Sequence, residues 1–276
     1  MAYLQMTDGI KLYYEDHGEG ETLLIVHGLN SDHLKIKDFI DSFKGEFRVV
    51  CYDQRGHNAS DHANTHLNVK RLGQDMHELI EALDLKDITL IGHSMGAAAA
   101  YSYINQFGCG RLKRLVAADM SPYMRNTVWK GGIGQGKWTD EDFLQDLDRY
   151  FEDPGVANWT IVTDLMLPAM KDTPAEMVPT MQILYGMGCD TLTAASLWYS
   201  LFRTDQRPAM DKVTVPFLYL MPEYPLYSTV TTDYIKEHVK GGFKLVNDFP
   251  GTSHMILLEA PKAASDAVKA FITETR

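Results

Sequence analysis

At 276 residues and a net charge of −11 at pH 7, the chain has the size of one α/β domain with an insertion, large enough to bury a substantial core. The acidic balance, without any Lys/Arg run, argues against nucleic acid or an anionic membrane as a partner. We see no signal-peptide pattern and no apolar run of membrane-spanning length. With three widely spaced cysteines, interpreted as reduced thiols, the sequence predicts a cytoplasmic protein and leaves its oligomeric state open.

Most of the chain alternates strand and helix signals. It begins with apolar–polar alternation on either side of Asp8-Gly9, which predicts a hairpin over 3–6 and 10–16. Further strands are predicted over 23–27, 47–52, 87–91, 112–119, 215–220 and 243–248, and helices over 33–43, 67–84, 97–104, 228–239 and 255–274. A short hairpin followed by strand–helix units predicts an α/β fold with a mostly parallel sheet and helices on both faces.

In the middle of the chain this alternation stops and helical signals dominate. Thr139 and Asp190 are each in position to cap a helix, and residues 173–176, Thr-Pro-Ala-Glu, form a capping box. All four tryptophans lie in this stretch, which we interpret as a helical cap over the open end of the sheet. The predicted domains are a core over 1–120 and 212–276 and a helical cap (lid) over 121–211.

Residues 92–96, Gly-His-Ser-Met-Gly, join a buried strand to an Ala-rich helix. Glycines two residues before and after Ser94 leave room for a turn so sharp that the serine is held in an unfavourable backbone conformation. The hydroxyl is then exposed at the end of the sheet, beside a helix N-terminus that favours negative charge. This is typical of a catalytic serine; the structural alternative is that Ser94 merely caps the helix.

A serine hydroxyl is a poor nucleophile until a base takes its proton. We predict that the base is His254, because it follows the last strand and so lies at the carboxyl edge of the sheet, as Ser94 does. A loop histidine that faces water is the alternative for His254. His93 is a weaker candidate base, since it is expected to pack beside the strand.

The oxyanion that develops on the substrate needs two hydrogen-bond donors. We predict the backbone N–H of Met95, which follows the nucleophile, and the backbone N–H of Leu29, in the loop after the strand that ends at His27. Because these are backbone roles, they constrain the two side chains only weakly.

Two carboxylates compete for the role of the acid that orients the histidine. Asp119 is the last residue of its strand, whereas Glu223 follows the next strand in the chain. We favour Asp119, because a strand end is better fixed than a loop, and Glu223 stays open. A solvated charge at a strand end is the structural alternative for either residue.

At this point the chain resembles the α/β-hydrolase superfamily along nearly its whole length. Four motifs carry the resemblance: His27-Gly28, Asp53-x-Arg55-Gly56-His57-x-x-Ser60, Gly92-His93-Ser94-Met95-Gly96 and Gly251-x-x-His254. The resemblance implies this fold and a Ser-His-acid site, and it is much less specific for substrate.

The sequence departs from most members at the turn after the strand 215–220, where the acid is usually found. Pro225 stands where the aspartate would be expected. A subset of the superfamily, including small bacterial esterases and some cofactor-free dioxygenases, carries the acid at the end of the preceding strand in an Asp-x-x-Pro setting. Residues 119–122, Asp-Met-Ser-Pro, look like that arrangement, so the resemblance also favours Asp119.

The predicted function is a serine hydrolase that cleaves a small, fairly apolar carboxylic ester, thioester or lactone through an acyl-enzyme on Ser94, without a metal or organic cofactor. One alternative uses a His254–Asp119 dyad for C–C bond hydrolysis or cofactor-free dioxygenation of an aromatic substrate. Another is a slow-turnover ligand receptor of the same fold. We set aside metal binding by the histidines and aspartate of residues 57–66, because no recognised ligand spacing connects them.

Overall fold

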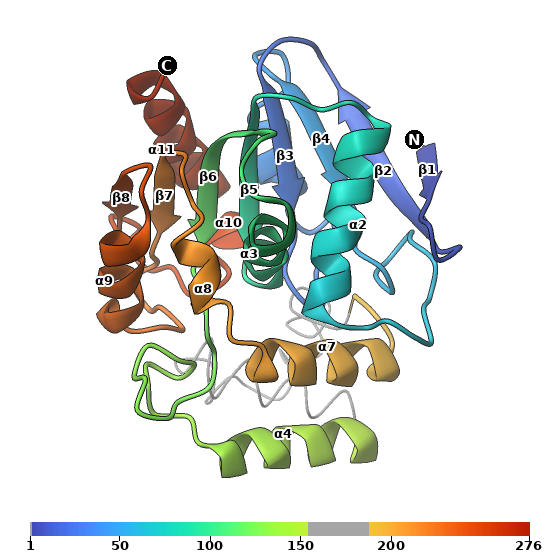
Figure 1. The fold of residues 1–276 in the computed structure, drawn as a ribbon, viewed down its shortest axis with the longest axis vertical. Helices are drawn as coiled ribbons and strands as arrows, with labels where there is room; N and C mark the ends of the chain where they lie inside the picture. The colour runs from blue at the N-terminus through green and yellow to red at the C-terminus, as the bar shows by residue number, and fades with distance from the viewer. Residues whose placement is uncertain (1, 154–187) are drawn as a thin grey trace.

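The computed structural model describes residues 2–153 and 188–276 (Figure 1). Eight strands form one sheet in the order β1-β2-β4-β3-β5-β6-β7-β8. The strands are β1 Ala2–Gln5, β2 Lys11–His17, β3 Thr22–Val26, β4 Arg48–Tyr52, β5 Ile88–His93, β6 Leu112–Ala118, β7 Phe217–Leu220 and β8 Phe243–Val246. β2 pairs antiparallel with β1 and β4, and the other neighbours are parallel, so the predicted hairpin and mostly parallel sheet are confirmed.

Helices cover both faces of this sheet. They are α1 Lys37–Asp41, α2 Val69–Ala82, α3 Met95–Phe107, α4 Asp140–Glu152, α7 Thr191–Arg203, α8 Arg207–Met210, α9 Thr229–His238, α10 Ile256–Glu259 and α11 Pro261–Glu274. Alternate side chains of β3 enter different cores: Leu24 and Val26 pack with α2 and α3, and Leu23 and Ile25 pack with α1 and α11. A strand covered on both faces is apolar at every position, which is the pattern that the sequence shows.

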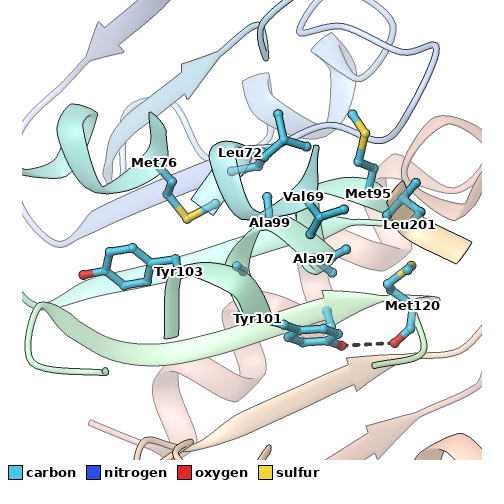
Figure 2. Close-up of a cluster of buried hydrophobic side chains, with 14 of the residues drawn as sticks. Val69, Leu72, Met76, Met95, Ala97, Ala99, Tyr101, Tyr103, Met120 and Leu201 are labelled. Carbon is cyan, nitrogen blue, oxygen red and sulfur yellow. Dashed lines mark hydrogen bonds between the residues drawn. The ribbon is translucent and has the colours of Figure 1, made fainter. Parts of the chain in front are cut away.

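Small residues let α3 lie very close to α2. Ala97 and Ala99 of α3 share a buried cluster with Val69 and Leu72 of α2, as Figure 2 shows. A β-carbon at Gly73 of α2 would lie 2.7 Å from the backbone nitrogen of Tyr103. This packing fixes the axis of α3, and therefore the position of its N-terminus at Ser94.

Two predicted helices differ from the structure. The helix predicted over 33–43 is only the short α1, because residues 33–36 form a turn in which the Asp32 carboxylate accepts the Lys35 amide at 2.9 Å. The helix predicted over 255–274 is two helices, α10 and α11. Pro261 occupies the first position of α11, where its missing N–H costs nothing, and the chain bends at Ala260.

α4 and α7 lie beyond the carboxyl ends of the strands (Figure 1). Thr139 caps α4 in a reciprocal capping box with Asp142, and the Asp190 side chain accepts the Thr193 amide at the start of α7, as the sequence predicts for both caps. The rings of Phe143 and Phe202 stack at 3.8 Å and join the two helices. The capping box predicted at 173–176 lies outside the described residues. Among the helices that the structure describes, none is both long and apolar enough to cross a membrane.

Candidate active site

Ser94 occupies the sharp turn between β5 and α3. Its backbone has φ 50° and ψ −121°, a strained conformation for a residue with a side chain. A β-carbon at Gly92 would lie 2.4 Å from the Ala97 nitrogen, and one at Gly96 would lie 2.2 Å from the Val26 carbonyl oxygen. Both glycines are therefore required for the turn, and the turn leaves the serine half-buried at the carboxyl edge of the sheet.

Asp119 and His254 form a buried hydrogen-bonded pair. The His254 Nδ1–H donates to Asp119 Oδ2 at 2.7 Å, and the same oxygen accepts the Leu226 amide at 2.8 Å. Both side chains are at most 2% exposed, which removes the competition of water. Three tyrosines surround the aspartate, Tyr101, Tyr219 and Tyr227; burial first, and then its negative charge, raises the pKa of each phenol. The three phenols around the carboxylate are therefore neutral.

The pairing assigns the tautomer of His254. Because Nδ1 donates its proton to Asp119, Nε2 carries the lone pair of the neutral ring. This buried Nε2 has no hydrogen-bond partner among the residues that the structure describes. An imidazole held in this way can accept a proton from a hydroxyl, as a general base does.

Glu223, the competing acid, lies elsewhere in the site. Its side chain is exposed, and Oε2 accepts the Gly251 amide at 2.6 Å. The next residue, Tyr224, donates its backbone amide to the Thr252 carbonyl at 3.0 Å. Glu223 thus binds the loop that contains His254, and it does not bind the imidazole of His254.

The loop after β3 lies against the serine. A β-carbon at Gly28 would lie 3.1 Å from the Ser94 β-carbon, so the Leu29 amide follows a residue in close contact with the nucleophile. Met95 is the first residue of α3, and its N–H has no helical acceptor. Neither amide donates a hydrogen bond to another described residue, so both remain able to bind an oxyanion.

Two buried histidines that the sequence analysis did not assign to the site hold this loop. The His27 Nδ1–H donates to the Gly28 carbonyl at 2.7 Å, and Nε2 accepts the Gln54 amide at 3.0 Å. His57 donates to the Arg55 carbonyl and accepts the Asn30 amide at 3.3 Å. Both histidines belong to the sequence motifs after β3 and β4, but only the folded structure shows that each one bridges the two loops.

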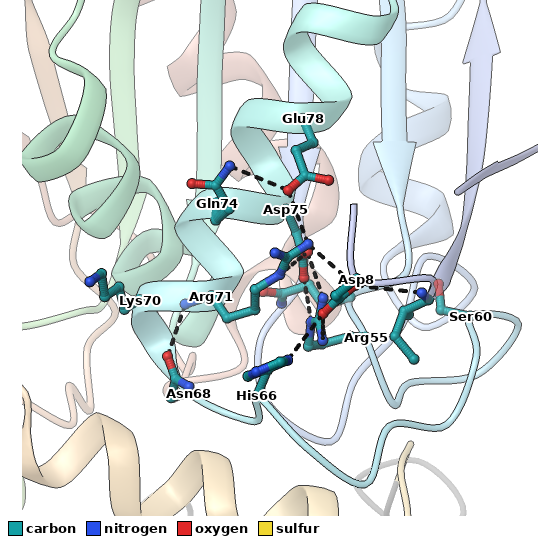
Figure 3. Close-up of polar contacts among 12 residues, drawn as sticks. Asp8, Arg55, Ser60, His66, Asn68, Lys70, Arg71, Gln74, Asp75 and Glu78 are labelled. Atoms are coloured by element: carbon teal, nitrogen blue, oxygen red, sulfur yellow. Dashed lines mark hydrogen bonds and ion pairs between the residues drawn. The ribbon is translucent and has the colours of Figure 1, made fainter. Parts of the chain in front are cut away.

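The same loop after β4 is tied to α2 through buried charges. Arg55, fully buried, makes hydrogen bonds of 2.5 and 2.7 Å to the Asp75 carboxylate. Figure 3 shows that Arg55 also pairs with Asp8, and Asp75 with Arg71. Removing one partner of such a network would leave an uncompensated buried charge. The network therefore makes the loop a rigid support for the site.

The loop after β4 also contains the four residues set aside as metal ligands: His57, Asp61, His62 and His66. They have separate partners: His62 pairs with Asp190 at 2.9 Å, His66 with Asp8 at 3.4 Å, and Asp61 accepts the Lys11 amide. Over residues 2–153 and 188–276, the structure contains no group of three or more His, Cys, Asp and Glu side chains that could hold a metal ion.

The comparison with protein families agrees with this architecture. A model of the alpha/beta hydrolase family matches residues 23–267, which include Ser94, Asp119 and His254 together with Leu29 and Met95. The chain belongs to the alpha/beta hydrolase family.

Individual relatives are more distant. The chain is 32% identical to the non-heme chloroperoxidase CPO-A1 of Kitasatospora aureofaciens over 119 residues, which is 42% of either chain. It is 23% identical to a 1H-3-hydroxy-4-oxoquinoline 2,4-dioxygenase of Pseudomonas putida over 96% of this chain and 97% of the relative. Among solved structures, the esterase EaEST of Exiguobacterium antarcticum matches with a TM-score of 0.85 at 20% identity, covering 98% of both chains. At such identity the structural match shows the fold alone.

Proposed function

We propose that the protein is a serine hydrolase that cleaves a small, fairly apolar carboxylic ester through an acyl-enzyme on Ser94. His254 serves as the general base and Asp119 as the acid that orients it, and the amides of Leu29 and Met95 bind the oxyanion. The observation that carries this proposal is the 2.7 Å hydrogen bond from His254 Nδ1 to Asp119, which leaves the Nε2 lone pair available in a site that also holds a strained serine.

The chemistry follows the order of proton transfers. Ser94 Oγ attacks the ester carbonyl as His254 Nε2 takes its proton, and the imidazolium is stabilised by the Asp119 carboxylate. The two backbone amides stabilise the negative charge of the tetrahedral intermediate. His254 then protonates the leaving alcohol, and in the second half it activates a water that releases the carboxylic acid and frees Ser94.

The apolar character of the substrate is inferred from the predicted cap. Its described helices, α4 and α7, lie beyond the carboxyl edge of the sheet and contribute buried aromatic side chains such as Phe143, Trp198 and Phe202. A cap of this kind excludes water from the site and favours apolar groups on the substrate. The names of the similar structures, which include esterases and an enol-lactonase, support a small ester or lactone as the substrate class.

The test is a series of p-nitrophenyl esters of graded acyl length, assayed with the wild-type protein and with Ser94→Ala. The proposal predicts hydrolysis that is fastest for one range of chain lengths and that falls to the residual level in the variant. Full activity of Ser94→Ala on these esters would contradict it.

A cofactor-free dioxygenase is the second candidate, and one observation favours it: the match to the quinoline dioxygenase extends over nearly the full length of both chains. In that chemistry the His254–Asp119 pair would deprotonate a hydroxylated aromatic substrate, and Ser94 would not be acylated. Oxygen consumption with hydroxylated N-heteroaromatic compounds, retained in Ser94→Ala and lost in His254→Ala, would identify this function in place of ester hydrolysis.

A further inference from the structure

His93 lies between the two loops that complete the candidate site. It ends β5 directly before Ser94, and its ring is 2% exposed. Its Nε2 lies 2.7 Å from the backbone carbonyl oxygen of His254, and the two imidazole rings are 5.0 Å apart. On the other side, a β-carbon at Gly28 would lie 3.1 Å from His93 Nδ1, so the loop that contains Leu29 packs directly on this ring.

These contacts assign both the tautomer and the charge of His93. A carbonyl oxygen can only accept, so Nε2 carries the proton, and the buried Nδ1 has no partner among the described residues. Burial, together with the imidazoles of His254 and His27, lowers the pKa of His93 to about 3. The ring of His93 is therefore neutral near neutral pH.

The hydrogen bond to the His254 carbonyl is a second anchor for the base. The first is the bond from His254 Nδ1 to Asp119, which fixes one edge of the ring. The carbonyl bond ties the backbone of His254 to the residue next to Ser94, although 161 positions separate the two histidines in the chain. With both anchors, the direction of His254 Nε2 is fixed relative to the serine.

We propose that His93 is a positioning residue for the reaction: its neutral Nε2–H fixes the backbone of His254 and so directs the base toward Ser94. This inference rests on the proposed hydrolase function. Neutrality is part of the role, because a second cation 5.0 Å away would oppose the imidazolium that His254 forms at each proton transfer.

The kinetic test compares His93→Leu with His93→Gln. Leucine removes the donor, whereas the glutamine amide nitrogen lies about as far from the backbone as the imidazole Nε2 and can donate to the same carbonyl. We expect kcat for ester hydrolysis, and the rate of labelling by a fluorophosphonate, to fall on the order of 10- to 100-fold in the leucine variant with KM little changed. The glutamine variant should recover most of both rates. His77→Leu, which removes a half-buried histidine of α2, is the matched control and should leave them unchanged.

Equal labelling rates for wild type and a folded His93→Leu would overturn the inference, as would a His93→Gln variant that loses as much as the leucine variant. A wild-type protein that is not labelled at all would instead overturn the proposed function, and the role of His93 with it.

A measurement on the wild-type protein is independent of whether the leucine variant folds. Long-range ¹H–¹⁵N correlation of the histidine rings should show one ring that is protonated at Nε2, unprotonated at Nδ1 and does not titrate between about pH 5 and 8. The assignment of that ring follows from its loss in His93→Gln. An Nδ1-protonated tautomer, or titration of His93 within that range, would overturn the proposal.

Discussion

At the residue scale, the site is built from histidines whose partners assign each a definite tautomer. His27 and His57 carry the proton on Nδ1 and use Nε2 to accept a backbone amide. His93 carries it on Nε2, where it donates to a carbonyl. Of these four histidines, only His254 combines an Nδ1–H bonded to a carboxylate with an Nε2 that accepts no protein donor among the described residues. The first three are supports, and the fourth has the electronic state that a general base requires.

The identity of the acid is tested by comparing Asp119→Asn with Glu223→Gln. An asparagine amide at position 119 can donate to Nδ1 and so stabilise the wrong tautomer of His254. We therefore expect kcat to fall by roughly 10⁴-fold in Asp119→Asn. Glu223→Gln should lose little, since a glutamine oxygen can still accept the Gly251 amide. Steady-state ester hydrolysis measures both, and a larger loss in the Glu223 variant would contradict the assignment.

The sequence predicts the candidate nucleophile and base better than it predicts the acid, for a physical reason. The elbow glycines and the position of His254 are local signals at one edge of the sheet. The choice between Asp119 and Glu223 depends on where two loops turn in space. Asp119 has a φ of 42°, and its carboxylate is held by the Leu226 amide from a loop more than a hundred positions away. Neither feature can be derived from residues 119–122 alone.

At the element scale, the position of Ser94 depends on how closely α3 packs on α2. α3 begins at the elbow with a buried run of four alanines, and further along, the missing side chain of Gly73 lets the backbone of α2 approach that of Ser102 and Tyr103. The site is thus positioned by the contact between two helices as well as by the turn itself.

This contact predicts a stability difference between two glycine substitutions. Gly73→Ala should lower the free energy of unfolding by up to about 2 kcal/mol, because its β-carbon meets the rigid backbone of Ser102 and Tyr103, an overlap that costs about 1–3 kcal/mol. The intrinsic helix preference for alanine over glycine, about 1 kcal/mol, acts in the opposite direction and is smaller than this overlap. Gly110→Ala, where nothing lies within 4 Å of the added carbon, should be nearly neutral. Urea denaturation of the two variants measures the difference, and equal stabilities would contradict this view of the packing.

The start of a helix could be predicted where a capping residue stands directly before a run with helical periodicity. The starts of α4 and α7 follow from Thr139 and Asp190, whose side chains bind backbone amides within their own first turn. The predicted helix over 33–43 was too long because apolar spacing alone cannot show that Asp32 competes for the Lys35 amide. The break between α10 and α11 was indicated in the sequence by Pro261, because proline favours the first position of a helix.

At the scale of the whole molecule, the site joins segments from both ends of the chain. The strands and the mostly parallel sheet follow from the alternation of elements, because parallel strands need crossover helices and buried faces. The histidine network could not be predicted in this way. The sequence shows His57 only as part of a loop motif and of a metal cluster that we set aside, whereas in the structure it is a buried support for the loop that contains Asn30.

Burial of these histidines predicts acid sensitivity of the fold. Burial is the main reason that the pKa of His57 and of His93 falls from 6.5 to about 3 in the folded protein. As the pH decreases from about 6.5 toward 3, the unfolded chain binds protons that the folded chain does not, so stability falls. Each group contributes at most about 1.4 kcal/mol per pH unit to this slope.

The pH dependence of unfolding, measured with urea at several values between pH 7.5 and pH 4, tests this expectation. We expect the free energy of unfolding of the wild type to decrease as the pH falls, and His57→Gln to show a shallower decrease, because one of the buried histidines is gone. The same slope in both proteins would show that His57 does not contribute.

The most direct test of the central claim is chemical. The folded protein is treated with a fluorophosphonate, and the adduct is located by mass spectrometry of the intact chain and of its peptides. We expect a single adduct on Ser94, absent in Ser94→Ala and formed far more slowly in His254→Ala. A folded wild-type protein that forms no adduct, or an adduct that persists in Ser94→Ala, would contradict the claim.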